Sequence, residues 1–251
     1  MFRLLSSRQP GSGRLLSLGR RLVTELLPGR CSVCGRVQHP EHGNCFLCSG
    51  CLNLLQPRTR GYCPSCARIY ADKSSLHTCQ QCRTSPFSWS SISFYSIYEG
   101  LLKELILRYK FTGQLGLGAV LADLLFQSVQ DVAHLLDCVV PVPLHEKRLR
   151  HRGFNQCLEL SLILGGRLNL PVFRQAVVKT RHTPPQSSVG RSSRLRNLKG
   201  VFRTEPGYVE GKRILLVDDI MTTGATLEEC TRTLLKARVR QVHAAFLARV
   251  V

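Results

Sequence analysis

The segment 213–230 reads RILLVDDIMTTGATLEEC, and it restricts the folds open to this chain more than any other part of the sequence. Its short continuous apolar run, 214–217, predicts a buried strand. The run ends in Asp218 and Asp219, and a turn of small hydroxyl residues and glycine precedes a helical pattern at 226–237. Because ligands bind beyond the carboxyl ends of strands in α/β sheets, this order predicts a ligand site at the end of the strand.

The chain after Pro86 alternates between strand and helix patterns, which predicts a mainly parallel sheet with helices on both faces. Strands are predicted at 91–98, 137–143, 172–178, 214–217 and 242–248. Helices are predicted at 101–109, 117–129, 156–168 and 226–237, and 183–193 is predicted to be a loop. We therefore expect an α/β domain at 87–251, and the hydrophobic fraction of 43% excludes a disordered chain.

The turn after the two acids has the composition of an anion-binding site. Backbone N–H groups at a helix start, helped by the helix dipole, can hold a phosphate, and glycine permits close approach. The residues concerned are Thr222, Thr223, Gly224, Ala225 and Thr226. Asp218 and Asp219 would accept hydrogen bonds from vicinal hydroxyls, so the pattern indicates a sugar phosphate. An ordinary strand end with an Asp helix cap explains one acid, but not two acids followed by this turn.

Nine of the twelve cysteines lie between Cys31 and Cys82, and most of them form C-x2-C pairs. Two such pairs supply the four thiolates of a closed, structural zinc site, so we expect two Zn²⁺ ions in a module at 30–86. The predicted ligands are Cys31, Cys34, Cys45 and Cys48 in one site, and Cys63, Cys66, Cys79 and Cys82 in the other. Cys51 is left over and could replace Cys45 or Cys48, and a cross-braced pairing is also open. A disulfide framework fits less well, because no secretory signal precedes the block and nine is an odd count.

The chain is strongly basic, with 35 Lys and Arg against 16 Asp and Glu, a net charge of +19. The window 141–200 holds twelve basic and two acidic residues, which predicts a polyanionic partner. Residues 1–29 carry five arginines and one acid. They are expected to be a weakly helical or disordered extension or an over-called translation start, and a transit peptide has the same composition. No window approaches the ~18 apolar residues of a membrane span, so we expect a cytoplasmic protein.

The segment 214–226 resembles the phosphoribosyl pyrophosphate (PRPP) binding motif of type I phosphoribosyltransferases. The wider chain resembles the ComF/GntX family of competence-associated, phosphoribosyltransferase-like proteins. The stretches that carry the wider resemblance are 141–144 with Arg148 and 152–156, then Arg181, Thr183 and Gln186 with Arg194, Asn197 and the run to Phe202, and the paired cysteines. The resemblance implies a type I phosphoribosyltransferase-like domain preceded by a small zinc-ribbon module. The departures from the family pattern are Cys51 and the arginine-rich leader.

The resemblance also implies a role for each matching position. The two acids would contact the ribose hydroxyls of PRPP, and the turn 222–226 would hold the 5′-phosphate. Arg148 and Arg152, in the loop after Val142, would lie near the pyrophosphate. The catalytic set would be Asp218, Asp219, Arg181 and Arg194, the two arginines being carried by a mobile cover. Mg²⁺ would be held mainly by substrate oxygens and water while an acceptor displaces pyrophosphate at the anomeric carbon.

Three functions fit these features. The first is a transferase that passes the phosphoribosyl group to an acceptor. The second is a PRPP-sensing protein that binds the ligand without turnover. The third is a nucleic-acid accessory protein, whose zinc ribbons and basic surface contact single-stranded DNA or competence proteins during DNA uptake. No base-recognition motif identifies the acceptor, and the oligomeric state stays open.

Overall fold

The computed structural model describes residues 29–38, 47–181, 183 and 197–251. The chain divides into two compact units, Met1–Leu52 and Asn53–Val251. This division falls inside the expected cysteine-rich module, so residues 53–86 belong to the same compact unit as the expected α/β domain. Each helix in the described ranges is too short or too polar to cross a lipid bilayer.

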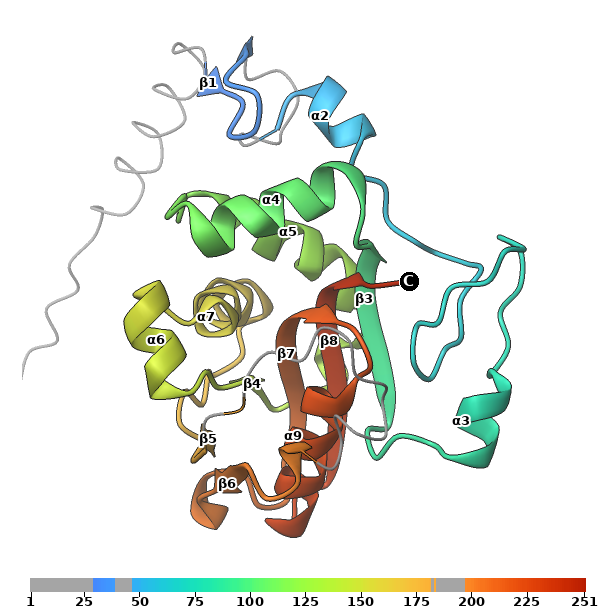
Figure 1. Ribbon diagram of the computed structural model, residues 1–251, viewed down its shortest axis with the longest axis vertical. Helices are drawn as coiled ribbons and strands as arrows, with labels where there is room; N and C mark the ends of the chain where they lie inside the picture. Colours follow the sequence, from blue (N-terminus) through green and yellow to red (C-terminus); the bar gives the residue numbers. More distant parts are fainter. Residues whose placement is uncertain (1–28, 39–46, 182, 184–196) are drawn as a thin grey trace, which may run out of the picture. The chain divides into compact units, whose positions relative to one another are not determined.

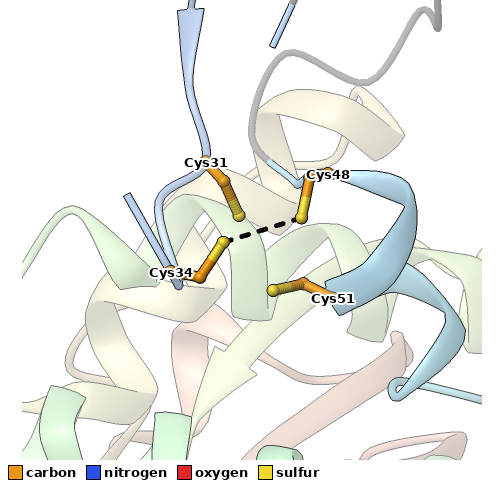
Figure 2. Close-up of side chains that lie close together, drawn as sticks. All are labelled: Cys31, Cys34, Cys48 and Cys51. Atoms are coloured by element: carbon orange, nitrogen blue, oxygen red, sulfur yellow. Dashed lines mark hydrogen bonds between the residues drawn. The ribbon is translucent and has the colours of Figure 1, made fainter. Parts of the chain in front are cut away.

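The described part of the first unit is a short hairpin followed by the start of a helix. Strands β1 (Gly29–Arg30) and β2 (Val37–Gln38) are antiparallel, and the turn between them carries one pair of cysteines. Helix α2 (Ser49–Asn53) begins directly after Cys48 and contains Cys51. Figure 2 shows the side chains of these cysteines directed toward one another: Cys31, Cys34, Cys48 and Cys51. Two sequence-distant segments therefore meet through their sulfur atoms.

The centre of the second unit is a four-stranded parallel sheet in the order β3–β8–β7–β4. The strands are β3 (Ser91–Ile97), β4 (Cys138–Pro141), β7 (Arg213–Met221) and β8 (Gln241–Arg249). The two central strands, β7 and β8, carry nearly continuous apolar runs, as strands buried on both faces do. The mainly parallel sheet confirms the α/β fold class expected from the alternating strand and helix patterns.

Helices cover both faces of this sheet (Figure 1). They are α4 (Gly100–Phe111), α5 (Leu117–Val129), α7 (Gln156–Leu168) and α9 (Ala225–Lys236). Helices α5 and α7 pack against the strands and against each other, with α4 beside α5, while α9 packs against β7 and β8. Ile214 and Leu216 share an apolar cluster with Leu227 and Cys230 of α9. Since side chains alternate along a strand, the intervening Leu215 faces the opposite layer.

The remaining described elements are short. They are α3 (Gln80–Thr84), η2 (Gln130–Leu135), α6 (Glu146–Arg152), η3 (Pro206–Tyr208), and the antiparallel pair β5 (Val177–Lys179) and β6 (Phe202–Thr204). Helix α6 lies where a loop was expected, because His145 Nδ1 accepts a hydrogen bond from Lys147 N at 3.2 Å and Gly153, with φ 84°, ends the helix. The strand predicted at 172–178 is wrong in extent: Val172 forms one bridge, to Val139, and β5 begins later.

The second half of the cysteine block packs into the α/β domain. Trp89 Nε1 donates to the carbonyl oxygen of Ser65 at 2.9 Å. The ring of Tyr62 meets that of Phe94 edge to face, with centroids 4.9 Å apart. Four buried cysteines of this block belong to the same apolar cluster as residues of β7 and α9: Cys63, Cys66, Cys79 and Cys82. These cysteines are therefore part of the core of the domain.

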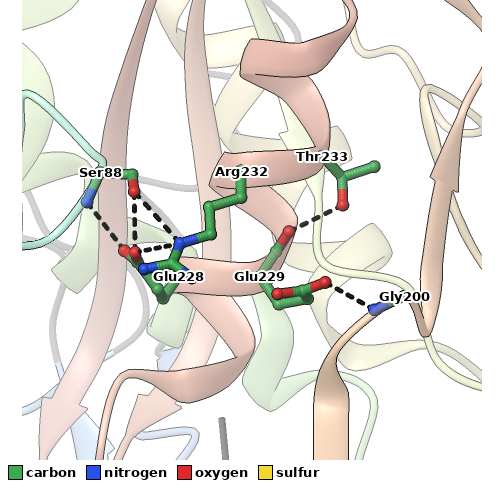
Figure 3. Close-up of polar contacts among 6 residues, drawn as sticks. All are labelled: Ser88, Gly200, Glu228, Glu229, Arg232 and Thr233. Atoms are coloured by element: carbon green, nitrogen blue, oxygen red, sulfur yellow. Dashed lines mark hydrogen bonds and ion pairs between the residues drawn. The ribbon is translucent and has the colours of Figure 1, made fainter. Parts of the chain in front are cut away.

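Two buried carboxylates in α9 hold segments that are distant in sequence (Figure 3). Glu228, which is 1% exposed, accepts from Ser88 N at 2.8 Å, from Ser88 Oγ at 2.7 Å and from Arg232 Nε at 2.7 Å. Glu229 accepts from the backbone N–H of Gly200 at 2.8 Å. Helix α9 thereby fixes the segment that leads into β3 and the segment that leads into β6.

We expect Glu228→Ala to lower the free energy of unfolding by about 3 kcal/mol, because it leaves the Ser88 N–H and the Arg232 guanidinium without their buried acceptor. Glu104→Ala is the matched control: Glu104 pairs with Arg108 at the same i,i+4 spacing and 3.2 Å, but its side chain is 59% exposed. Exposed pairs of this kind contribute about 0.5 kcal/mol or less. Urea unfolding measures both losses, and equal losses would contradict the anchoring role of Glu228.

Candidate functional site

The two acids lie where β7 continues beyond its neighbour β4. β7 pairs with β4 up to Val217, but with β8 as far as Met221. Asp218 and Asp219 are therefore inside the strand, which corrects the prediction that the strand ends before them. Their exposed fractions are 9% and 5%. They stand at the carboxyl edge of the sheet, where α/β domains bind their ligands.

Each acid has a different partner. Cys157 Sγ, at the start of α7, donates to Asp218 Oδ1 at 3.3 Å, and the backbone N–H of Asp219 donates to the same oxygen at 2.8 Å. Lys110 Nζ, near the end of α4, lies 2.6 Å from Asp219 Oδ2. Asp219 thus has a cation beside it, whereas Asp218 has neutral donors.

This difference appears in the acidity of Asp218. Burial and the negative charge of Asp219 raise the pKa of Asp218 to about 7, and its hydrogen bonds and the charge of Lys110 only partly oppose that rise. Burial and the charge of Asp218 also raise the pKa of the Cys157 thiol well above its ordinary value, so the thiol stays protonated and donates. The free protein therefore holds a proton on Asp218 up to about neutral pH.

The turn between β7 and α9 has the geometry that its composition predicts. Gly224 precedes the helix with φ 78°, a left-handed conformation that favours glycine. A Cβ atom at Gly224 would lie 2.8 Å from Met221 Cε and 3.0 Å from Phe87 Cε1. Thr223 Oγ1 accepts a hydrogen bond from Ala225 N at 3.4 Å. The first N–H groups of a helix lack partners within the helix, and the start of a helix is therefore a common anion site.

The motif at 152–156 works as a junction between two helices. Gly153 ends α6, and Asn155 Oδ1 accepts from the N–H groups of Cys157 and Leu158 at the start of α7. Asn155 Nδ2 also donates to the carbonyl oxygen of Val142, the residue after β4, at 3.3 Å. The motif therefore fixes where α7 begins and so places Cys157 against Asp218.

The predicted arginines are placed in part. Arg148 lies on α6. The burial of Lys179 and the positive charge of Arg148 lower the pKa of Lys179, while the negative charge of Asp218 opposes this effect. The guanidinium of Arg152 covers the ring of Phe111, 5.3 Å from its centroid. Arg181 donates to the carbonyl oxygen of Lys199 at 3.4 Å. Arg194, the other predicted catalytic arginine, lies outside the described residues.

Four cysteines of the first unit could hold a metal ion. The sulfur atoms of Cys31, Cys34, Cys48 and Cys51 all lie within 4.8 Å of one another. Burial opposes ionisation of Cys31, but backbone N–H groups outweigh it and lower the pKa of this thiol to about 6. Three of the predicted ligands of this site, Cys31, Cys34 and Cys48, are in the cluster together with Cys51, and Cys45, the fourth predicted ligand, lies outside the described residues.

The second cluster consists of Cys63, Cys66, Cys79 and Cys82, and their sulfur atoms also lie within 4.8 Å of one another. All four are buried. Cys63 Sγ accepts from the backbone N–H of Cys79 at 3.3 Å, and such donors outweigh burial and lower the pKa of Cys63 to about 7. Backbone donors of this kind stabilise thiolates, the form that binds metals.

The sequence did not single out Lys110 and Cys157, which contact the acids. Cys157 directly follows the motif 152–156, and that position was the available signal. No pattern in the sequence indicates that Lys110 contacts the acids, because only the tertiary fold brings α4 to the end of β7. Cys51 could have been chosen by comparing the two halves: Cys48 precedes α2 as Cys79 precedes α3.

Comparisons with known proteins place the site in a family context. Residues 156–250 match the family described as "Phosphoribosyl transferase domain". The chain is 33% identical to "Competence protein F" of Haemophilus influenzae, over 88% of this chain and 96% of that protein. It is 34% identical to "DNA utilization protein YhgH" of Salmonella typhimurium, over 84% and 92%, and 31% identical to "Competence protein ComFC" of Bacillus subtilis, over 76% and 78%. The matched domain includes both acids, the turn and α9.

The raised pKa of Asp218 predicts a pH effect on stability. The folded protein keeps the proton up to about pH 7, whereas an unfolded chain releases it near 3.8, so the free energy of unfolding should fall as pH rises between these values. Relative to Asp218→Asn, which has no such proton, we expect wild type to lose more than about 1 kcal/mol from pH 4 to pH 7, since a tenfold change in acidity corresponds to about 1.4 kcal/mol.

Urea unfolding across this pH range measures the difference, and Asp137→Asn is the control. The hydrogen bonds of Arg213 lower the pKa of Asp137 to about 2, so its ionisation contributes an almost constant amount to the free energy of unfolding above about pH 5. A parallel pH profile for wild type and Asp218→Asn would refute the assignment.

Proposed function

Because this chain belongs to the ComF family, we propose that it binds PRPP with Mg²⁺ at the carboxyl edge of β7 and transfers the phosphoribosyl group to an acceptor. One observation carries the proposal: two buried acids near the end of β7 are followed by a glycine turn at the start of α9. Both features lie within the stretch that matches a phosphoribosyl transferase domain. The acids supply acceptors for ribose hydroxyls and the turn supplies donors for a phosphate, so the two halves of a sugar phosphate are recognised side by side.

In this proposal the acids bind the ribose. Asp218 and Asp219 accept hydrogen bonds from the vicinal hydroxyls, and the proton that Asp218 holds in the free protein must leave as these donors arrive. Lys110, 2.6 Å from Asp219 Oδ2, keeps that carboxylate oriented. The backbone N–H groups of Thr223, Gly224 and neighbouring residues, with the threonine hydroxyls, hold the 5′-phosphate.

The basic residues bind the pyrophosphate. Lys179 lies in the electrostatic range of both Arg148 and Asp218, and Arg152 lies on the same helix as Arg148. In the reaction the acceptor attacks the anomeric carbon, the bond to the pyrophosphate oxygen breaks, and the electron pair leaves with pyrophosphate. Arg181 and Arg194 neutralise this leaving group.

The side chains at the site suit Mg²⁺ in part. Asp218 and Asp219 offer the oxygen ligands that Mg²⁺ prefers, but the nearby Cys157 is a soft ligand and Lys110 already neutralises Asp219. The residues therefore fit Mg²⁺ that arrives with substrate phosphates and not an all-protein cage. When bound, it neutralises charge on the phosphates.

We expect wild type to bind PRPP with Mg²⁺, and Asp218→Asn/Asp219→Asn to lose about 100-fold in affinity, because two charged hydrogen-bond acceptors are removed. Calorimetry measures the affinity, with ribose 5-phosphate and pyrophosphate for comparison. Asp137→Asn, at the opposite end of β7 beside Arg213, is the control and should bind normally. Binding without transfer to any acceptor would indicate a PRPP sensor.

Absence of binding in a folded, metal-loaded sample would reject the proposal. Contact with single-stranded DNA, which the net charge of +19 and the names of the competence relatives favour, would then be the leading function.

We further propose that both cysteine clusters bind zinc. A tetrahedron with zinc–sulfur bonds of about 2.3 Å has sulfur–sulfur edges of about 3.8 Å. The distance between Cys34 Sγ and Cys48 Sγ is 3.6 Å, and that between Cys66 Sγ and Cys79 Sγ is 3.8 Å. The spacing suits zinc, and four thiolates leave no position for a substrate, so the role is structural.

Metal analysis of purified protein should find two equivalents of zinc. We expect Cys51→Ser to retain one equivalent, because Cys51 belongs to the first cluster. Cys45→Ser is the matched control and should retain two. If instead Cys45→Ser loses one equivalent and Cys51→Ser loses none, the ligand assignment of the first site is wrong.

A further inference from the structure

Arg249, the last residue of β8, joins three segments through their backbones. Its Nε donates to the carbonyl oxygen of Cys66 at 3.2 Å. Its Nη1 donates to the carbonyl oxygens of Met221 at 3.0 Å and Val250 at 2.6 Å, and also to that of Thr222. One guanidinium therefore links the second cysteine cluster to the turn that follows the two acids.

An independent set of contacts links the same two places from another direction. The ring of Phe87 lies against Gly224 and stacks on the ring of Trp89, with centroids 3.9 Å apart. Trp89 in turn donates to the carbonyl oxygen of Ser65, between the first two cysteines of the cluster. Ser88, the residue between Phe87 and Trp89 in the sequence, donates two hydrogen bonds to Glu228 of α9. The cysteine turn is thus bound to the start of α9 by two routes.

The charge of Arg249 is directed to this turn. An arginine stays protonated at neutral pH. In the described part of the chain, the hydrogen bonds of Arg249 go to backbone carbonyl oxygens. The side chain of Arg249 is partly buried, and partial burial strengthens its hydrogen bonds relative to the same bonds in water. The positive charge behind Thr222 also attracts an anion bound at the turn.

We propose that Arg249 is a positioning residue that connects metal binding at the second cysteine cluster to phosphate binding at the turn, so that each strengthens the other. The proposal rests on the proposed function, since it concerns the same phosphate site. Metal binding fixes the position of the Cys66 carbonyl oxygen, and this oxygen accepts a hydrogen bond that orients the guanidinium of Arg249. The guanidinium in turn donates to the carbonyl oxygens of Met221 and Thr222 and holds them in place. The N–H groups of the following residues are then oriented for the phosphate. By thermodynamic linkage, the phosphate ligand must raise the metal affinity by the same factor.

The experiment measures zinc affinity of the second cluster in the full-length chain, by equilibrium competition with a zinc-selective chromophoric chelator. Cys31→Ser/Cys34→Ser removes the first site, which belongs to the other compact unit, so that one zinc remains. Affinity is compared with and without saturating PRPP and Mg²⁺, and with inorganic phosphate in place of PRPP. We expect the ligand to raise zinc affinity by about 10-fold, within the usual range of linkage between two sites.

Three variants in this background separate positioning from charge. Arg249→Gln should lose the linkage and also bind PRPP more weakly. Arg249→Lys keeps the charge but cannot donate to the Cys66 and Thr222 carbonyls together, so it should lose the linkage. In the zinc-loaded protein it should therefore bind PRPP more weakly than wild type does, but less weakly than Arg249→Gln, because the charge remains. Arg68→Gln is the control, because Arg68 lies next to the cluster and bonds Gln81 instead of the turn; its linkage should be that of wild type.

The outcomes distinguish this inference from the proposed function. If wild type binds PRPP but its zinc affinity does not change, the inference is overturned and the proposed function stands. If Arg249→Lys keeps the full linkage, another route joins the sites and the role of Arg249 is overturned, whether or not Arg249→Gln folds. If neither PRPP nor phosphate binds wild type, both proposals fail.

Discussion

The parallel pairing of β7 with β8 is the interaction on which the candidate site depends. It continues past the end of β4, through Asp218 opposite Phe246, to Met221 opposite Arg249. Pairing on one side holds the backbone of both acids in place, while the other side is left beside the start of α7. The same register brings the end of β8 to the turn, because Met221 and Arg249 are direct partners. A strand that ended with β4 would place neither the acids nor Arg249.

Holding two adjacent carboxylates in this position costs stability. Each charge removed from water needs a partner, and like charges side by side repel. The ammonium of Lys110 offsets this for Asp219, while Asp218 relies on the Cys157 thiol and a backbone N–H and so takes up a proton near neutral pH. Under the proposed function the ligand brings hydroxyl donors for both acids, in addition to the ammonium of Lys110.

The sequence predicted what local pattern can determine. Helices α5 and α7 match their predicted ranges, 117–129 and 156–168, because their apolar residues recur at helical spacing over three turns or more. The end of β7 was not predictable, because two acids read as a strand end and only the pairing with β8 keeps them inside the strand. Helix α6 was not predicted, because it has no apolar stripe and its end signals, His145 and Gly153, do not indicate a helix without one. The choice of Cys51 is likewise tertiary, since C-x2-C spacing fits either pairing.

The two cysteine clusters are built alike but belong to different physical contexts. In each, a tight turn carries one pair and the start of a short helix carries the other. The first lies in its own compact unit, whereas the second lies in the core of the α/β domain, with Trp89 and Phe94. If four buried thiolates lose their metal ion, the surrounding core is destabilised, because buried polar groups without partners lower the stability of the fold. Residues 53–86, the second half of the cysteine block, therefore pack as part of the α/β domain.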